Sequence, residues 1–247
     1  KSLIPAVCDL YGIPYVGSDP YVVSLCRDKY RCSCILAQNG IPVPGAWLYQ
    51  PIGAWIHEPP VNAGELIAKP NYEAASIGID ESNVCTESTI YKKAQQLESV
   101  YHQEILAEKF ISGYEVEVPV IVSGNVPTVF FPVGISLGGP RKMGKRILNY
   151  HLRSMDAYEY YNFSLENPQA AKAALDAAYK TAKILNIKGF GLVDLRISES
   201  GNVYVTDIAT NPHYTTGSSY EFLFSQLGFH YDDLVACLIA SSIGEGT

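Results

Sequence analysis

Apolar positions recur along the chain with two periods, and each period predicts a different kind of element. A spacing of three to four residues predicts long helices over residues 24–39, 88–101 and 168–186. Shorter helices are predicted over residues 3–11, 220–227 and 232–243. Apolar runs bounded by turn residues predict strands over residues 13–18, 41–49, 65–70 and 104–111.

The second half of the chain contains two patterns typical of antiparallel hairpins. Strand-like runs flank a turn at Gly124-Asn125 within residues 114–137, and a second pair of runs flanks Ser200-Gly201. Residues 141–163 are polar and lack a period, so we predict a long loop there. Antiparallel strands mixed with helices indicate the α+β fold class.

The composition is that of a globular protein, and it narrows the choice of partners. The 247 residues are 47% hydrophobic and 17% charged, which is enough for a substantial buried core. A net charge of −7 argues against a dedicated nucleic-acid binder, which normally presents a basic field. The most apolar stretch, residues 118–139, holds three prolines and four glycines, so it predicts sheet strands rather than a membrane span. We therefore expect small-molecule partners, with no nucleic acid and no membrane.

The cysteines and the first residues bear on the cellular compartment. The six cysteines lack the paired spacing of zinc sites or small secreted domains, so we expect reduced thiols. The opening segment is broken by Pro5, Asp9 and Gly12 before the apolar core of a signal peptide could form. Both observations favour a cytoplasmic protein.

Two acids stand inside otherwise apolar strands of the second hairpin, Asp194 in LVDLR and Asp207 in VTDIA. A buried carboxylate is costly unless a cation, a donor or water accompanies it. If the strands pair around Ser200-Gly201, the two acids lie roughly opposite one another and repel unless a cation separates them. Oxygen ligands of this kind suit Mg²⁺. The alternative is a pair of edge-strand acids that face solvent.

Two lysines are candidates for binding phosphate. Lys69 ends an apolar strand directly before the small residues 74–78, whose backbone N–H groups could approach phosphate oxygens. Lys29 lies on a predicted helix after Arg27-Asp28. Taken singly, a lysine at either position is usually a solvated surface residue.

The segment EKFISGYEVEV supplies a third group of candidates. Glu108 precedes Phe110, an arrangement in which the backbone can pair with an adenine edge while the aromatic ring covers its face. Glu115, seven residues after Glu108, could accept ribose hydroxyls. A surface strand with a turn at Gly113 is the alternative.

Five stretches, in this order, resemble the ATP-grasp superfamily, and most closely its D-alanine–D-alanine ligases. The stretches are GIPYVGSDPYVVSLCRDKYRCSCILAQNGIPVP, IAKPNYEAASIGI, ILAEKFISGYEVEV, GFGLVDLRISESGNVYVTDIATNP and TTGSS. They span nearly the whole chain, and their joint order and spacing carry the resemblance because each is short. It implies an ATP-grasp fold, in which two α+β subdomains hold the nucleotide between two antiparallel sheets.

The resemblance also implies a role for each candidate residue. Lys29 and Lys69 would lie on the phosphates of ATP, under a loop that contains Ser76. Adenine would be held by Glu108 and the backbone of Phe110 and Ile111, and ribose by Glu115. The metal, Mg²⁺ with Mn²⁺ as an alternative, would be held by Asp194, Asp207 and Asn211. Arg153 and Ser218 would act at the substrate. Such ligases phosphorylate a carboxylate with ATP, and an amine then attacks the acyl phosphate, chemistry that depends on positioning and charge neutralisation.

Several positions depart from the pattern of this family. The asparagine expected two residues after the second metal acid is Ala209, so Asn211 would have to replace that ligand. The arginine expected two residues before the first metal acid is Leu192. Further departures are Ala74-Ala75 in the phosphate loop, Arg153-Ser154 in place of a lysine-tyrosine pair, and His213 in place of a glycine. The departures cluster at the amino-acid site, whereas the predicted ATP site is nearly complete.

Three functions remain open at this point. The first is an ATP-dependent carboxylate–amine ligase that forms a dipeptide, as D-alanine–D-alanine ligases do for peptidoglycan. The second is a ligase of the same chemistry with another amino-acid or carboxylate substrate, and the third is a nucleotide-binding protein without catalysis. A homodimer is one assembly that the resemblance leaves open.

We expect three parts in the chain. Residues 1–26 would be the remnant of an N-terminal domain, residues 27–118 the central subdomain, and residues 119–247 the C-terminal subdomain with the metal site. The basic run at residues 141–146 is either a solvated loop or a lid over the site.

Overall fold

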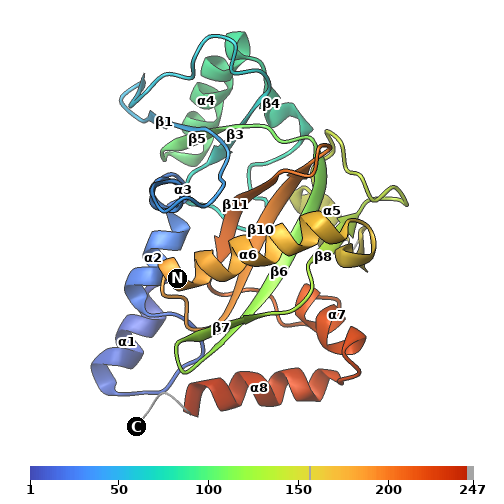
Figure 1. Ribbon diagram of the computed structural model, residues 1–247. Helices are drawn as coiled ribbons and strands as arrows, with labels where there is room; N and C mark the ends of the chain where they lie inside the picture. Colours follow the sequence, from blue (N-terminus) through green and yellow to red (C-terminus); the bar gives the residue numbers. More distant parts are fainter. Residues whose placement is uncertain (156, 244–247) are drawn as a thin grey trace.

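The computed structural model describes residues 1–155 and 157–243, and of residues 153, 154, 242 and 243 it describes the backbone only. Two antiparallel sheets form separate layers, one above the other in Figure 1. The predicted α+β class with two antiparallel sheets is thereby confirmed. Three helices lie along one side of the molecule: α1 Leu3–Tyr11, α2 Pro20–Arg27 and α3 Lys29–Gln38.

The smaller sheet, at the top of Figure 1, has five strands in the order β2-β1-β5-β3-β4. Its strands are β1 Ala46–Gln50, β2 Ala54–Trp55, β3 Leu66–Pro70, β4 Val84–Cys85 and β5 Ile105–Lys109, with the 3-10 turn η1 Glu81–Asn83 before β4. Helix α4 Glu87–Tyr101 covers one face of this sheet and buries Ile90, Ala94 and Leu97 there. A capping box at Thr86 fixes the start of the helix. The smaller sheet thus has a core of its own.

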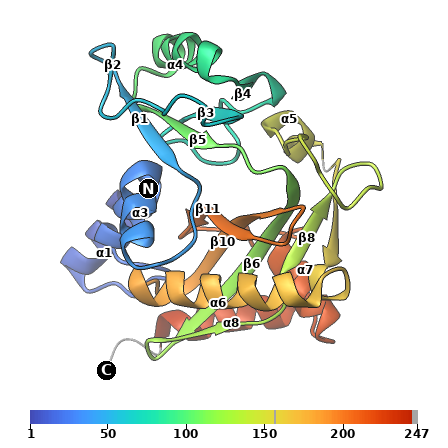
Figure 2. The same cartoon turned by 45° about the horizontal axis from the view of Figure 1, so that its top comes forward.

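The larger sheet follows the order β11-β10-β6-β8-β9, and β7 pairs with β6 beside this path. Its strands are β6 Gly113–Ser123, β7 Val126–Val129, β8 Val133–Ser136, β9 Glu159–Asn162, β10 Gly189–Ser198 and β11 Val203–Ala209. Helix α6 Pro168–Ile184 lies across one face, as Figure 2 shows, while α7 Ser219–Gln226 and α8 Tyr231–Ile243 cover the other. Asn167 caps α6, and Pro168 occupies its first position.

Alternation along β6 gives the larger sheet two different faces. Val116, Val118 and Val120 are fully buried in the core that α6 covers. On the opposite face, Ile121 packs against the cluster formed with α7 and α8. Glu115 and Glu117 share that second face, because strand side chains repeat every two residues, and they line a cavity beyond the helices. The uncovered end of this face therefore carries polar groups.

Three predicted elements are wrong. The helix expected over residues 24–39 is two helices, because Asp28 leaves helical geometry and its side chain accepts a hydrogen bond from Arg31 N to start α3. The strand expected at residues 13–18 is an irregular connection between α1 and α2. The loop expected over residues 141–163 contains α5 Tyr150–Ser154, β9 and the 3-10 turn η2 Phe163–Leu165. Strand β9 was missed because its pairing with β8 is a long-range contact.

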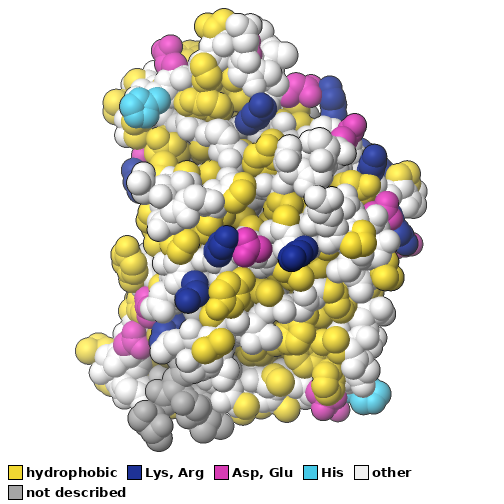
Figure 3. Space-filling view, viewed as in Figure 1, with side chains coloured by type: hydrophobic (Ala, Val, Ile, Leu, Met, Phe, Trp, Pro, Cys, Tyr) yellow, Lys and Arg dark blue, Asp and Glu magenta, His cyan; other side chains and the backbone are white. Residues whose placement is uncertain are grey.

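The other predicted helices, the strands at β1, β3 and β5, and both hairpins are confirmed within two or three residues, apart from the start of the 41–49 strand, since β1 begins five residues later. A division by sheets falls between β5 and β6, whereas the expected boundary at residues 118 and 119 lies inside β6. All six cysteines have free thiols, as predicted. Figure 3 shows acidic and basic side chains interspersed over α6, where Lys180 and Asp176 pair at 2.7 Å. Over the described residues, the helices are too short or too polar to cross a membrane.

Candidate nucleotide and substrate site

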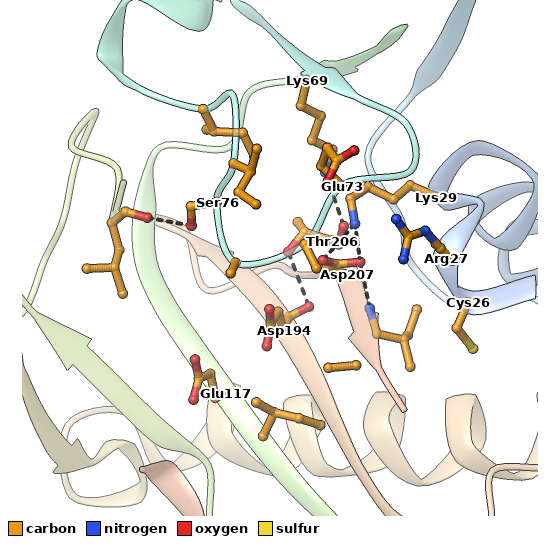
Figure 4. Close-up of a pocket in the computed structure, with 18 of the residues that line it drawn as sticks. Cys26, Arg27, Lys29, Lys69, Glu73, Ser76, Glu117, Asp194, Thr206 and Asp207 are labelled. Carbon is orange, nitrogen blue, oxygen red and sulfur yellow. Dashed lines mark hydrogen bonds and ion pairs between the residues drawn. The ribbon is translucent and has the colours of Figure 1, made fainter. Parts of the chain in front are cut away.

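A cavity of 240 Å³ lies between the two sheets, and strands of both sheets supply its walls. Figure 4 shows side chains of α3, β3 and β11 converging on it. Every residue predicted for nucleotide or metal binding lines this cavity: Lys29, Lys69, Ser76, Glu108, Phe110, Ile111, Glu115, Asp194, Asp207 and Asn211. Residues far apart in the sequence are thus brought together in the arrangement that the ATP-grasp resemblance implies, although their individual roles remain predictions.

The two acids of the last hairpin lie opposite one another, as predicted. Asp194 of β10 is the register partner of Asp207 of β11, and the register shifts just after Asp194. The ammonium Nζ of Lys29 lies 2.9 Å from both carboxylate oxygens of Asp207. Lys29 is buried at the start of α3, so its charge and that of Asp207 offset each other in a site that is partly shielded from water.

A second ion pair joins β3 and β5 of the smaller sheet, and its lysine also contacts the larger sheet. Lys69 Nζ lies 2.6 Å from Glu108 Oε2, and both residues are buried, at 6% and 3% exposure. The same ammonium donates a hydrogen bond of 3.2 Å to the carbonyl of Thr206 on β11. An unpaired charge would be costly at this buried position, so the ion pair with Glu108 fixes the Lys69 ammonium group at the cavity wall.

Glu115 lies beside a cation that the sequence patterns did not single out. Arg196 Nη2 is 3.1 Å from Glu115 Oε2, and the guanidinium lies 5.5 Å from the ring centre of Phe110. Arg196 also donates to the carbonyl of Arg146, which connects it to the basic run at residues 141–146. The predicted ribose acid and the predicted adenine-covering ring are therefore held by one arginine.

The phosphate loop has an unusual backbone. Ala75 and Ser76 both have positive φ, 55° and 57°, a region that residues other than glycine seldom occupy. The hydroxyl of Ser76 donates a 2.8 Å hydrogen bond to the carbonyl of Leu148, as the dashed line in Figure 4 marks. This bond ties the loop to the segment that follows the basic run, so the two loops that border the cavity are connected.

The two acids, Asp194 and Asp207, are suitable ligands for a magnesium ion that is bound together with a nucleotide. Magnesium is usually held by one or two carboxylates together with phosphate oxygens and water, rather than by an all-protein cage. Asp194 and Asp207 supply such a pair of carboxylates from neighbouring strands. Among the described residues, no group of three or more acid, histidine or cysteine side chains could hold a metal ion by itself. Asn211 lines the cavity, and its Oδ1 accepts a hydrogen bond of 3.2 Å from the hydroxyl of Thr210.

A second cavity of 310 Å³ adjoins the first, and four residues line both: Ala75, Glu117, Leu192 and His213. Ser218, one of the two predicted substrate residues, lines this second cavity as the N-cap of α7. Its Oγ accepts a hydrogen bond of 3.2 Å from Glu221 N. The other, Arg153, belongs to α5, but its side chain lies outside the described residues. The second cavity is therefore the space in which the resemblance would place the amino-acid site.

Glu117, Arg196 and Cys26 are among the cavity residues that the sequence analysis did not predict. Glu117 and Arg196 share a strand face with Glu115 and Asp194, so a period of two along EVEV and DLR could have identified them. Cys26 lies in the last turn of α2 and lines the first cavity together with Lys29. A hydrogen bond with Cys32, and then burial, raise the pKa of the Cys26 thiol well above its ordinary value. Its position could not be predicted, because the break between α2 and α3 was not.

The chain was compared with known families and proteins. Residues 62–240 match the family described as D-ala D-ala ligase C-terminus. A D-alanine–D-alanine ligase of Bordetella pertussis is 28% identical over 246 residues, which cover 95% of this chain and 72% of that protein. One from Azoarcus sp. is 25% identical, covering 97% and 75%.

Solved structures show the same fold. A D-alanine–D-alanine ligase from Bacillus anthracis, complexed with ATP, superposes with a TM-score of 0.75 at 20% identity, over 98% of this chain and 74% of that one. The VanG D-Ala:D-Ser ligase from Enterococcus faecalis superposes with a TM-score of 0.75 at 22% identity, over 98% and 68%.

Proposed function

The chain belongs to the family of D-alanine–D-alanine ligase C-terminal domains, and from this premise we propose that it is an ATP-dependent ligase. It forms the amide bond of D-alanyl-D-alanine, a peptidoglycan precursor, through an acyl phosphate. The observation that supports the proposal best is the single cavity lined by all the predicted nucleotide and metal residues, with a second cavity that opens beside it.

The described side chains suit the first half of this reaction. Lys29 and Lys69 bring two ammonium groups to one cavity, where they would neutralise the triphosphate as its terminal group moves to a carboxylate. Mg²⁺ bound at Asp194 and Asp207 would supply further charge neutralisation to the phosphates. Between the two sheets water would be largely excluded, which protects an acyl phosphate from hydrolysis.

A second candidate is a ligase of the same chemistry with a different amino acid as one substrate. Leu192 favours it, because this side chain lines both cavities at the position where the family places an arginine. Without a positive charge at this position, the junction between the two cavities would favour other substrate groups than a ligase with the arginine does. A location in the cytoplasm, where ATP and amino acids are available, is part of the proposal.

The test is ADP release by the purified natural protein with ATP, Mg²⁺, K⁺ and a panel of D- and L-amino acids. We expect ADP release that depends on D-alanine, with D-alanyl-D-alanine detected by mass spectrometry and L-alanine inactive. Release that depends on another amino acid would support the second candidate. Nucleotide binding with no release for any amino acid would contradict both candidates.

A further inference from the structure

Two separate segments present the lysines of the nucleotide cavity, and one buried side chain joins these segments. Lys69 is the second-last residue of β3, and Lys29 is the first residue of α3. Figure 4 shows both lysines reaching β11, where Lys29 contacts Asp207 and Lys69 contacts the carbonyl of Thr206. Asn71, two residues after Lys69, is fully buried and bonds to the start of α3.

All four polar groups of Asn71 take part in hydrogen bonds. Its side-chain Oδ1 accepts a bond of 2.9 Å from Tyr30 N, and its Nδ2 donates one of 2.9 Å to Asp28 Oδ1. Its backbone carbonyl accepts a longer bond of 3.4 Å from Lys29 N, and its backbone N–H donates to the carbonyl of Glu104 at 3.0 Å. Three consecutive residues, with Lys29 at their centre, are thus held by the residue that directly follows β3.

These bonds also cap the start of α3. The first N–H groups of a helix have no acceptor within the helix and need one from elsewhere. Asn71 accepts from the first two of these groups in α3, and Asp28 accepts from the third, Arg31 N, at 3.1 Å. Because protein acceptors occupy the helix start, α3 offers a phosphate the ammonium group of Lys29 rather than its backbone. The place of that ammonium group depends on how Asn71 holds the helix.

The two side-chain bonds require an amide at this position. Residue 71 must donate to Asp28 Oδ1 and accept from Tyr30 N at the same time, and an amide carries both kinds of group. A carboxylate in its place would face the carboxylate of Asp28 and repel it. An alanine would leave Tyr30 N without its acceptor.

We propose that Asn71 is a positioning residue for the triphosphate, because it fixes the start of α3 against the end of β3 and so sets the spacing of the Lys29 and Lys69 ammonium groups. Only Pro70 separates Asn71 from Lys69, and its ring restricts the backbone, so a shift of α3 would also disturb Lys69. The proposal rests on the nucleotide-binding part of the proposed function, in which both lysines contact phosphate. It adds the residue that holds them in register.

The experiment compares two ligands that differ in their phosphates. Mg²⁺·ATP would contact both lysines, whereas adenosine would fill only the base and ribose part of the cavity. In titration calorimetry, Asn71→Ala should raise Kd for Mg²⁺·ATP about 10-fold and leave Kd for adenosine within about 2-fold, because the displaced ammonium groups contact phosphate alone.

An exchange of side chains between positions 28 and 71 tests the cause of this loss. Asn71→Asp alone sets two carboxylates against each other and should weaken Mg²⁺·ATP binding at least as much as Asn71→Ala. In the double variant Asp28→Asn/Asn71→Asp, the amide and the carboxylate change places and can form the same bond in the opposite direction. Kd for Mg²⁺·ATP should therefore return to within about 3-fold of that of the unmodified protein. Both variants preserve side-chain size, which keeps the test decisive if Asn71→Ala does not fold.

Asn167→Ala is the matched control. Asn167 also caps a helix, because its Oδ1 accepts a bond of 3.0 Å from Ala170 N at the start of α6. Helix α6 covers the face of the larger sheet that is turned away from the cavity. The control variant should melt at a lower temperature and leave Kd for both ligands unchanged.

Three results would overturn the proposal. Weaker binding of Mg²⁺·ATP and adenosine by the same factor would assign Asn71 to the fold alone. Unchanged binding of Mg²⁺·ATP in Asn71→Ala would refute the positioning role, as would the absence of recovery in the double variant. Failure of the ligase function is distinguishable, because the unmodified protein would then release no ADP with any amino acid, while its Kd for Mg²⁺·ATP would still report on Asn71.

Discussion

Replacing Lys69 by methionine separates what its buried ion pair contributes to folding from what the lysine contributes to nucleotide binding. Lys69 Nζ lies 2.6 Å from Glu108 Oε2, and the two side chains are 8% and 4% exposed. Without the lysine, Glu108 becomes a buried charge with its main partner removed, which costs about 3–5 kcal/mol. A chain of this length loses about 2–4 °C in melting temperature per kcal/mol, so Lys69→Met should melt about 6–20 °C lower.

The double variant Lys69→Met/Glu108→Met tests the cause of that loss. An apolar pair of similar volume is about as stable as a buried ion pair, so the double variant should regain most of the melting temperature in calorimetry. ATP affinity, measured by titration calorimetry with Mg²⁺, should stay weak in both variants because each lacks the ammonium group. Equal melting temperatures for the single and double variants would refute the reasoning about burial, and recovered ATP affinity would refute the phosphate role of Lys69.

An exposed ion pair of nearly equal length provides the matched control. Lys145 Nζ lies 2.7 Å from Glu65 Oε1, but these side chains are 67% and 42% exposed. Water screens this pair, so Lys145→Met should change stability by about 1 kcal/mol or less. A loss as large as that of Lys69→Met would show that burial is not what makes the Lys69 pair important.

Three further predictions follow from described contacts. Asp207→Asn should abolish Mg²⁺-dependent nucleotide binding, because it weakens both the metal site and the Lys29 contact at 2.9 Å; unchanged affinity in a titration would contradict the metal assignment. Burial alone would raise the pKa of Glu104, but hydrogen bonds from Arg31 and Tyr72 outweigh it and lower that pKa. The stability that Glu104 contributes is therefore present above its ordinary pKa and lost as pH falls through the lowered value, so Glu104→Gln should destabilise by about 1 kcal/mol or less near neutral pH, with the difference in melting temperature vanishing in strong acid. The hydrogen bond with Cys32 and burial keep the Cys26 thiol protonated, so iodoacetamide at mildly alkaline pH should label the exposed Cys34 first, and mass spectrometry showing equally rapid labelling of Cys26 would contradict this.

Local patterns predicted those parts of the site that lie on a single hairpin or strand. The opposition of Asp194 and Asp207 followed from the turn at Ser200-Gly201, because a hairpin fixes its own register. Lys69 at the end of β3 was found in the same way, since an apolar run ends there. The same reasoning failed at Asp28, where hydrophobic periodicity continues through a break that only side-chain capping reveals.

The partners of these groups depend on contacts between distant segments, which one-dimensional patterns do not specify. Lys29 and Asp207 are 178 residues apart in the chain, and their contact depends on α2, which directly precedes α3, packing against β11 at the edge of the larger sheet. Glu117 shows this limit of sequence patterns most clearly. Alternation along β6 predicts which face of the strand carries it, but the elements that cover that face come from distant parts of the chain. Helices α7 and α8 pack on Ile121, whereas Glu117, four residues earlier on the same strand face, lines both cavities, and the strand pattern alone does not specify this difference.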